Sequence, residues 1–320
     1  MYLFWLGFIV IVIILLALDL GVFHKKEHVI GTREALLWTL FWIALSLVFN
    51  VFIYYAYENH WLGIGVHATS VESGADAALK YFTGYIIEKS LSLDNIFVIA
   101  LIFAYFKVPN IYQHRVLFWG ILGALILRGI MIIAGAALIQ QFSWMIFVFG
   151  GLLIITAIKM LLSDDEQIDP ERNILIRIAR KFYPVSTNFV GHKFFTRINS
   201  KKAITPLFLV LLVIESTDVL FAIDSIPAIF AVTTDSYIIF TSNIFAILGL
   251  RSLYFALAAM MDKFKYLKLS LVFVLAFVGV KMLLSHSYPI PTLVSLSVIA
   301  GILFVGTAAS VIVSRRESKN

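Results

Sequence analysis

Nine long apolar runs follow one another along the chain, and each is about long enough to cross a lipid bilayer as a helix. A helical crossing needs about 20 residues. A helix also satisfies its own backbone polar groups, which a membrane-spanning segment requires. The alternation typical of β-barrel strands is absent from these runs. We therefore predict an all-α polytopic membrane protein with helices at residues 2–23, 35–57, 79–105, 115–138, 143–162, 204–232, 236–260, 266–284 and 292–313.

Composition supports this fold class. Of the 320 residues, 61% are hydrophobic and 14% are charged, whereas charged residues make up about a quarter of a soluble domain. The first run lacks a basic leader and a small-residue cleavage pattern, so we expect a retained helix and not a signal peptide. The chain has no cysteine, so it offers neither disulfides nor thiolate metal ligands.

Basic residues gather on one side of the predicted topology. Nineteen Lys and Arg residues fall on that side, and Lys80 alone falls on the other. The positive-inside rule then places the N-terminus outside and the C-terminus in the cytoplasm. The net charge of +6 is thus mainly a topology signal, with attraction to anionic lipid headgroups as a second effect. We expect the lipid bilayer, and not nucleic acid, as the partner of these charges.

One long polar stretch, residues 163–203, divides the chain. It opens with the acidic run 164–166 and holds Pro170 and Pro184. A linker that carries topology charges is the simpler interpretation. The alternative is a short amphipathic helix over 174–182 on the cytoplasmic surface.

Three sequence markers occur in the same order on both sides of this linker. Arg128 comes 34 residues after Asp94, and Arg251 comes 33 residues after Asp218. Agreement in order and spacing over three markers favours an internal repeat. The paired markers are SLDNIF and STDVLF, then ILGALILRG and ILGLRS, then KMLL and KMLL.

Each repeat contains three predicted helices. Three is an odd number, so the second copy must cross the membrane in the opposite sense. Inverted repeats are an architecture of secondary transporters, which bind substrate near the midplane between the halves. The predicted organisation is 1–78 for helices 1 and 2, 79–162 for repeat 1, 163–203 for a cytoplasmic linker, 204–284 for repeat 2 and 285–320 for helix 9 with a basic tail.

Six carboxylates lie inside the predicted spans. Asp19 stands near the cytoplasmic end of the first span and is expected to be peripheral, which leaves five. A charged residue at the centre of a span costs roughly 2.5–3.5 kcal/mol, so a group of them calls for an explanation. Structural pairing with Lys89, Arg128 and Arg251 is one explanation. Three bases cannot neutralise five acids, however, so the surplus favours protons or a bound cation, with the bases as counter-charges. The carboxylates are Glu88, Asp94, Glu215, Asp218 and Asp224.

The spacing of these acids predicts an irregular helix. Glu215 and Asp218 share one helix face, whereas Asp224 is six residues beyond Asp218 and lies about 120° around a regular helix. Pro227 cannot hydrogen-bond to the carbonyl of Ile223. We therefore predict a helix break at Pro227 that turns Asp224 toward the same site.

Ligand type narrows the choice of ion. The seven histidines fall in loops or at the ends of the spans, which leaves oxygen donors at the centre. Carboxylate and amide oxygens suit manganese, magnesium or calcium better than copper or zinc. Asn95 and Asn243 are the amide candidates, and the hydroxyls of Ser92, Thr217 and Ser225 are weaker ones. No permanently bound cofactor is expected, because the ion would be the substrate.

The same motifs carry a family resemblance over essentially the whole chain. EKSLSLDNIFV, ESTDVLFAIDSIPAIFAVTTD and TSNIFAILGLR resemble the TerC family of integral membrane proteins, and length and layout resemble its alkali-inducible, Alx-type branch. The resemblance implies a bacterial inner-membrane protein that exports manganese, or that supports cation homeostasis and metal supply to exported proteins. It also implies that the acidic motif residues are Glu88, Asp94, Glu215, Asp218 and Asp224.

These observations lead to two hypotheses from different classes. The first is a secondary transporter that exports Mn²⁺ by alternating access between 79–162 and 204–284, with proton countertransport as an extension. The second is a non-transporting membrane factor that assists metalation or insertion of other proteins. We do not expect an enzyme, because no nucleophile–histidine pair falls in the spans and H-E-x-x-H is absent. The sequence carries no signal for an oligomeric state.

Overall fold

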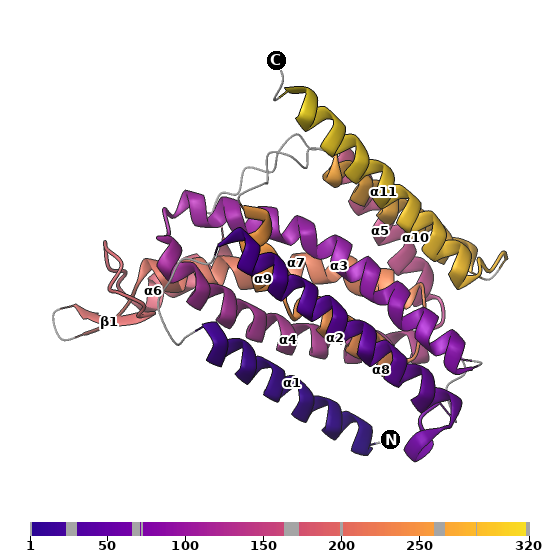
Figure 1. Ribbon diagram of the computed structural model, residues 1–320. Helices are drawn as coiled ribbons and strands as arrows, with labels where there is room; N and C mark the ends of the chain where they lie inside the picture. Colours follow the sequence, from indigo (N-terminus) through magenta and orange to yellow (C-terminus); the bar gives the residue numbers. More distant parts are fainter. Residues whose placement is uncertain are drawn as a thin grey trace.

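The computed structural model describes residues 2–23, 31–65, 71, 73–162, 173–198, 201–258, 266–285 and 287–317. The acidic run 164–166 and the first part of the predicted linker lie outside the described residues. Helices dominate the described part (Figure 1). They are α1 (Tyr2–Phe23), α2 (Thr32–Glu58), η1 (Trp61–Gly63), α3 (Gly74–Tyr105), α4 (Asn110–Gln141), α5 (Met145–Leu162), α6 (Ile174–Phe182), α7 (Pro206–Phe230), α8 (Ser236–Ile247), α9 (Leu250–Ala258), α10 (Leu267–Leu284) and α11 (Thr292–Glu317).

The predicted fold class, an all-α polytopic membrane protein, is confirmed. Within the described part of the chain, six helical segments are long and apolar enough to cross a membrane: α2, α4, α5, α7, α8 with α9, and α11. Their outward surfaces are apolar; Ile126, Ile130 and Ile133 on α4 are 58–67% exposed, which suits contact with lipid. The 32-residue α3 carries Glu88, Lys89 and other charges in its interior. The count of nine spans stays a prediction.

The helices pack in two groups (Figure 1). In the larger group, α3 packs against α7 and α8, α4 packs against α7, and α2 packs against α3 and α9. In the second group, α10 packs against α5 and α11. The crossing of α5 and α10 is close because two glycines meet there. A Cβ at Gly150 would lie 3.0 Å from the carbonyl oxygen of Gly279.

The predicted helix break at Pro227 is wrong. Pro227 lies inside α7, which runs from Pro206 to Phe230 without interruption. Proline removes one backbone hydrogen bond, to the carbonyl of Ile223, and membrane helices tolerate such a loss when neighbouring helices support the segment. Pro227 is also buried and stands in the last turn of α7, where few hydrogen bonds are at stake.

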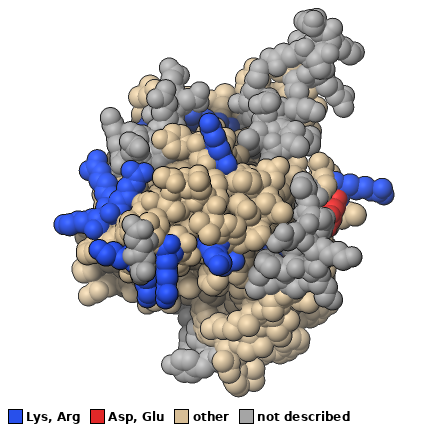
Figure 2. Space-filling model, turned by 90° about the vertical axis from the view of Figure 1, so that its left-hand side faces the viewer, with Lys and Arg blue, Asp and Glu red and all other residues tan. Residues whose placement is uncertain are grey.

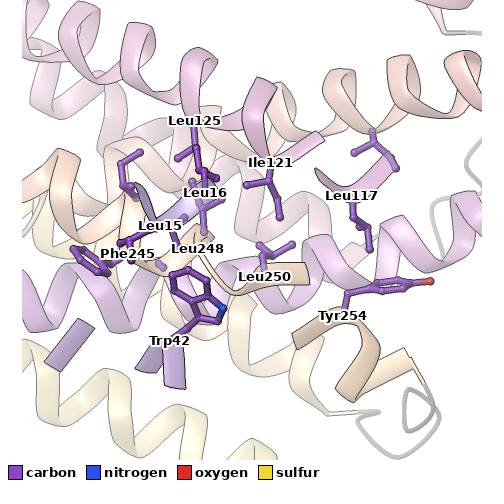
Figure 3. Close-up of a cluster of buried hydrophobic side chains, with 14 of the residues drawn as sticks. Leu15, Leu16, Trp42, Leu117, Ile121, Leu125, Phe245, Leu248, Leu250 and Tyr254 are labelled. Atoms are coloured by element: carbon purple, nitrogen blue, oxygen red, sulfur yellow. The ribbon is translucent and has the colours of Figure 1, made fainter. Parts of the chain in front are cut away.

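The break occurs instead in the next helix along the chain. The predicted helix 236–260 is divided into α8 and α9 at Leu248 and Gly249, and Gly249 has a φ of +80°. Glycine adopts this conformation without the steric penalty of a Cβ. A Cβ at Gly249 would also lie 2.6 Å from the Trp42 ring. Figure 3 shows the apolar side chains around the break, including Leu16, Trp42, Leu248 and Leu250.

The second part of the predicted linker is folded. Helix α6 spans Ile174–Phe182, as the alternative interpretation of this stretch predicted, and the Asn173 side chain caps it by accepting from Leu175 N and Ile176 N. Strands β1 (Phe195–Ile198) and β2 (Lys201–Ile204) form an antiparallel hairpin that the sequence analysis did not predict. We call the end of the helix bundle that carries α6 and this hairpin the basic end.

Candidate ion-binding site

A buried arginine lies between two carboxylates at the centre of the larger helix group. Arg128 on α4 is 1% exposed, and its Nη1 donates to Oε1 of Glu88, which is fully buried on α3. Its Nη2 donates to Oδ1 of Asp218 on α7 at 2.9 Å, and its Nε donates to Oδ2 at 3.4 Å. The two carboxylates thus share one guanidinium, and three helices are tied together by charge.

Asn243 on α8 completes this cluster from a fourth helix. Its Nδ2 donates to Oε2 of Glu88 at 3.2 Å, and its Oδ1 accepts from Nη1 of Arg128 at 3.3 Å. Ser92 Oγ donates to Oε1 of Glu88 at 3.3 Å, and Ser225 Oγ accepts from Arg128 at 3.5 Å. Polar groups in a low-dielectric interior are costly unless they are paired. Both oxygens of Glu88 are paired here, so the cluster is stable as it stands.

A small cavity of about 30 Å³ adjoins the cluster, and Asn95, Thr217, Asp218 and Arg128 contribute its polar lining. One water needs roughly 10–15 Å³ of such space, so the cavity has room for one or two waters or a small ion. Among the described residues, Oδ1 of Asn95 is buried and has no hydrogen-bond partner. An amide oxygen beside a cavity with no protein donor is suited to bind a water or a cation.

Glu215 lies one turn before Asp218 on α7 and against α4. A Cβ at Gly123 would overlap its carboxylate, so the glycine makes room for this side chain. Oε2 of Glu215 is buried and has no hydrogen-bond partner among the described residues. A buried, incompletely paired carboxylate is expensive in a protein interior, and a proton or a cation would relieve that cost.

The other two predicted acids do not line the cavity. Asp224 accepts a hydrogen bond from Thr156 Oγ1 on α5 at 2.8 Å. Asp94 is half-buried on α3 and does not line the cavity. Among the described residues, no three His, Asp or Glu side chains form a group that could hold a metal ion. The predicted ligands are therefore not gathered into one preformed metal cage.

The predicted counter-charges have three different surroundings. Arg128 lies in the cluster, as described above. Lys89 donates to the carbonyl of Ala246 at 3.2 Å, in the last turn of α8, where a cation is favoured by the helix dipole. Arg251 instead pairs with Asp19 on α1, with Nη2 at 2.9 Å from Oδ1 and 2.7 Å from the Asp19 carbonyl.

Sequence reasoning missed three residues of this region. Asp19 was expected to be peripheral because it stands near the end of the first span, yet it is buried with Arg251. Thr156 carried no charge to mark it. Gly123 had a visible signal, since its Ile-Leu-Gly triplet recurs at Gly249.

Together these features define the class of protein: a multi-pass integral membrane protein with a buried cluster of charged and polar side chains shared by four of its helices. A comparison with known families then gives the particular relationship. The chain belongs to the integral membrane protein TerC family, whose family model matches residues 73–318.

Full-length relatives agree with this assignment. The chain is 52% identical to an uncharacterized membrane protein of Myxococcus xanthus over 97% of the chain and 92% of the relative. It is 45% identical to an uncharacterized membrane protein of Rickettsia bellii over 96% and 97%. It is 43% identical to the "putative membrane-bound redox modulator Alx" of Escherichia coli K12 over 99% and 97%. No solved structure matches the chain.

Proposed function

We propose that the protein is a secondary transporter that exports Mn²⁺ from the cytoplasm. The observation that carries the proposal is Arg128 held between Glu88 and Asp218 beside a small polar cavity. A fixed structural tie would need no cavity and would leave no oxygen unpaired. Here Asn95 and Glu215 each keep a buried oxygen without a protein donor among the described residues.

In this proposal Arg128 is an internal cation that competes with the metal. Glu88 and Asp218 bind the guanidinium when the site is empty, which avoids two uncompensated charges in a low-dielectric interior. A divalent cation would bind these carboxylates once the guanidinium moves aside, with the amide oxygens of Asn95 and Asn243 as further ligands. An oxygen-only donor set favours Mn²⁺, Mg²⁺ or Ca²⁺. Protons could take the metal's place on Glu215 and Asp218 during the return step.

The helix packing supports two inverted repeats. The proposed repeats match α3 with α7, α4 with the pair α8–α9, and α5 with α10. Under this match, the contact of α3 with α8 is equivalent to the contact of α7 with α4. The contacts of α3 with α7 and of α5 with α10 join corresponding helices. Secondary transporters use such halves to expose a central site to each side in turn. The basic end is proposed to face the cytoplasm of the bacterial inner membrane, which follows from the positive-inside rule.

A non-transporting membrane factor for metalation or insertion is the alternative function. It also uses a stable helix bundle, but it does not require the central carboxylates to change partners. The absence of cysteine argues against direct thiol chemistry in this chain. The two functions therefore differ in what neutralisation of Asp218 should do.

Mn²⁺ uptake into everted membrane vesicles tests the proposal. Asp218→Asn should abolish uptake, because the amide cannot supply the negative charge that binds the metal. Asp19→Asn is the matched control, since it neutralises a buried carboxylate that pairs with Arg251 outside the cluster. It should retain uptake per folded molecule. The amount of folded protein is measured by gel filtration of the solubilised protein in detergent. Wild-type uptake by Asp218→Asn would reject transport through this site and favour the membrane factor.

A further inference from the structure

The α6–hairpin region is unusually basic. Residues 173–204 contain seven Lys and Arg residues and no Asp or Glu. We call this region the platform; the structure describes it as residues 173–198 and 201–204. Figure 2, which faces the basic end, shows blue Lys and Arg side chains gathered there and red confined to one edge. The seven basic residues are Arg177, Arg180, Lys181, Lys193, Arg197, Lys201 and Lys202.

The platform also exposes an apolar face. Ile174, Ile178 and Phe182 recur every four residues on α6 and are 71%, 48% and 71% exposed. Phe195 on β1 is exposed as well. The opposite side of α6 is anchored, because Ile176 is buried. An exposed apolar row beside basic side chains is typical of a helix that lies at a membrane interface.

Contacts with α7 place helix α6 beside a membrane-spanning helix. At the start of α6, Nδ2 of Asn173 donates to Oγ of Ser216 at 2.6 Å. Beyond its end, the backbone N–H of Ile204 donates to the carbonyl of Pro184 at 2.9 Å. Helix α6 therefore runs antiparallel to the first part of α7. Its first turn lies deeper along α7, and its basic last turn, with Arg180 and Lys181, lies nearer the end of the span.

We propose that the platform is a binding surface for anionic phospholipid headgroups. The apolar row of α6 contacts acyl chains, and Arg180, Lys181 and the basic residues of the hairpin contact the headgroup phosphates. A cluster of four to eight basic residues beside a spanning helix is the charge pattern that recognises anionic lipid. The assignment to the cytoplasmic leaflet rests on the proposed orientation, but binding itself does not depend on the proposed transport.

The lipid bilayer fits better than a soluble partner. Nucleic acid would use the positive charge but not an isoleucine–phenylalanine row at the level of a membrane span. A soluble acidic protein would have to reach the first turn of α6, which packs alongside α7 at Ser216. Lipid satisfies the charge, the apolar row and the location together.

Lipid retention by the purified full-length chain in detergent tests the proposal. Phosphatidylglycerol and phosphatidylcholine are titrated separately, and retained lipid is counted by native mass spectrometry. We expect the wild type to prefer phosphatidylglycerol. The double change Arg180→Gln with Lys181→Gln should lower the affinity for phosphatidylglycerol roughly tenfold or more, since each basic residue near the surface raises that affinity about fivefold. Ile178→Ser should also weaken retention. Raising the salt concentration should weaken wild-type binding by screening.

The matched control is Arg33→Gln with Lys107→Gln. Both residues are exposed basic residues outside the platform, and the change in net charge, from +6 to +4, is the same. It should retain phosphatidylglycerol within twofold of wild type. The proposal would be overturned if both double variants lost the same amount of retained phosphatidylglycerol. It would also be overturned if the wild type showed no preference for phosphatidylglycerol over phosphatidylcholine, and a protein partner would then be the better occupant. Full displacement by inorganic phosphate would also overturn it, because a phosphate site needs no apolar row.

Discussion

Helix α4 and the pair α8–α9 contain the same Ile-Leu-Gly triplet, but the helix is continuous through the triplet in α4 and interrupted at it between α8 and α9. In each case the glycine is thirteen residues beyond the first residue of the helix, from Asn110 to Gly123 and from Ser236 to Gly249. Helix α4 continues through Gly123, where the missing side chain makes room for Glu215. Helix α8 instead ends at Ile247, and Gly249 adopts a positive φ and packs on Trp42.

Because of this difference, the two repeat-related arginines pair with different partners. Arg128 is five residues beyond its glycine, and Arg251 is two residues beyond its own. The continuous helix delivers Arg128 between Glu88 and Asp218, whereas the break directs Arg251 to Asp19 on α1. One arginine therefore pairs with both acids of the central cluster, and the other ties an outer helix to the bundle.

The largest expected effect separates these two arginines. Arg128→Gln leaves the buried Glu88 and the partly buried Asp218 without their common cation, and breaking a buried pair costs about 3–5 kcal/mol of unfolding free energy. We also expect loss of Mn²⁺ export. Arg251→Gln removes an ion pair outside the cluster, so the folded fraction should still export. Thermal unfolding in detergent and export per folded molecule measure the two effects. Export by Arg128→Gln at the wild-type rate would show that the cluster is structural.

The next effect concerns the break itself. Gly249→Ala forces a side chain into positive φ, a strain of order 1–3 kcal/mol, and its Cβ overlaps Trp42. We expect a lower unfolding midpoint in detergent. Gly151→Ala is the control, because a Cβ there meets no atom within 4 Å, and alanine favours the helix by up to about 1 kcal/mol. A Gly249→Ala protein as stable as Gly151→Ala would mean that the break is not required for folding.

The sequence predicted the helical fold and the central charges because both leave strong signals. Long apolar runs have few alternatives in a bilayer, and a midspan charge is too costly to occur without a partner. The pairing of Arg128 with acids was one of the two explanations of that cost, and Asn243 was predicted as a ligand because of its amide oxygen. The residue types alone thus identified much of the cluster before any distance was known.

The location of the break and the partner of Arg251 could not be predicted in the same way. Proline is a strong local signal, yet packing and a position in the last turn let α7 continue through Pro227. Gly249 gave a weak local signal, but its conformation is fixed by contact with Trp42, more than 200 residues away in sequence. Asp19 was likewise placed by tertiary packing of α1, which no local spacing reveals.

A third effect tests the role of the glycine in the continuous helix. Gly123→Ala should preserve or slightly raise stability through helix propensity. Its Cβ should nevertheless displace Glu215 and lower Mn²⁺ export by roughly tenfold, a change of about 1.4 kcal/mol. Adding Glu215→Asp shortens the displaced side chain and should recover part of the export. If the double variant exports no better than Gly123→Ala alone, the overlap with Glu215 is not the cause.

The smallest effect is expected at Pro227, where the sequence predicted the break. Because α7 is already continuous, Pro227→Ala restores a hydrogen-bond donor toward Ile223 without changing the path of the helix. A proline inside a helix costs about 3 kcal/mol, but in the last turn we expect a gain in stability of about 1 kcal/mol or less. Export should stay within twofold of wild type. Loss of export with unchanged stability would show that transport needs a bend at Pro227 in another conformation of the protein. Helix α7 would then have a point of bending of its own, in addition to the break at Gly249 between α8 and α9.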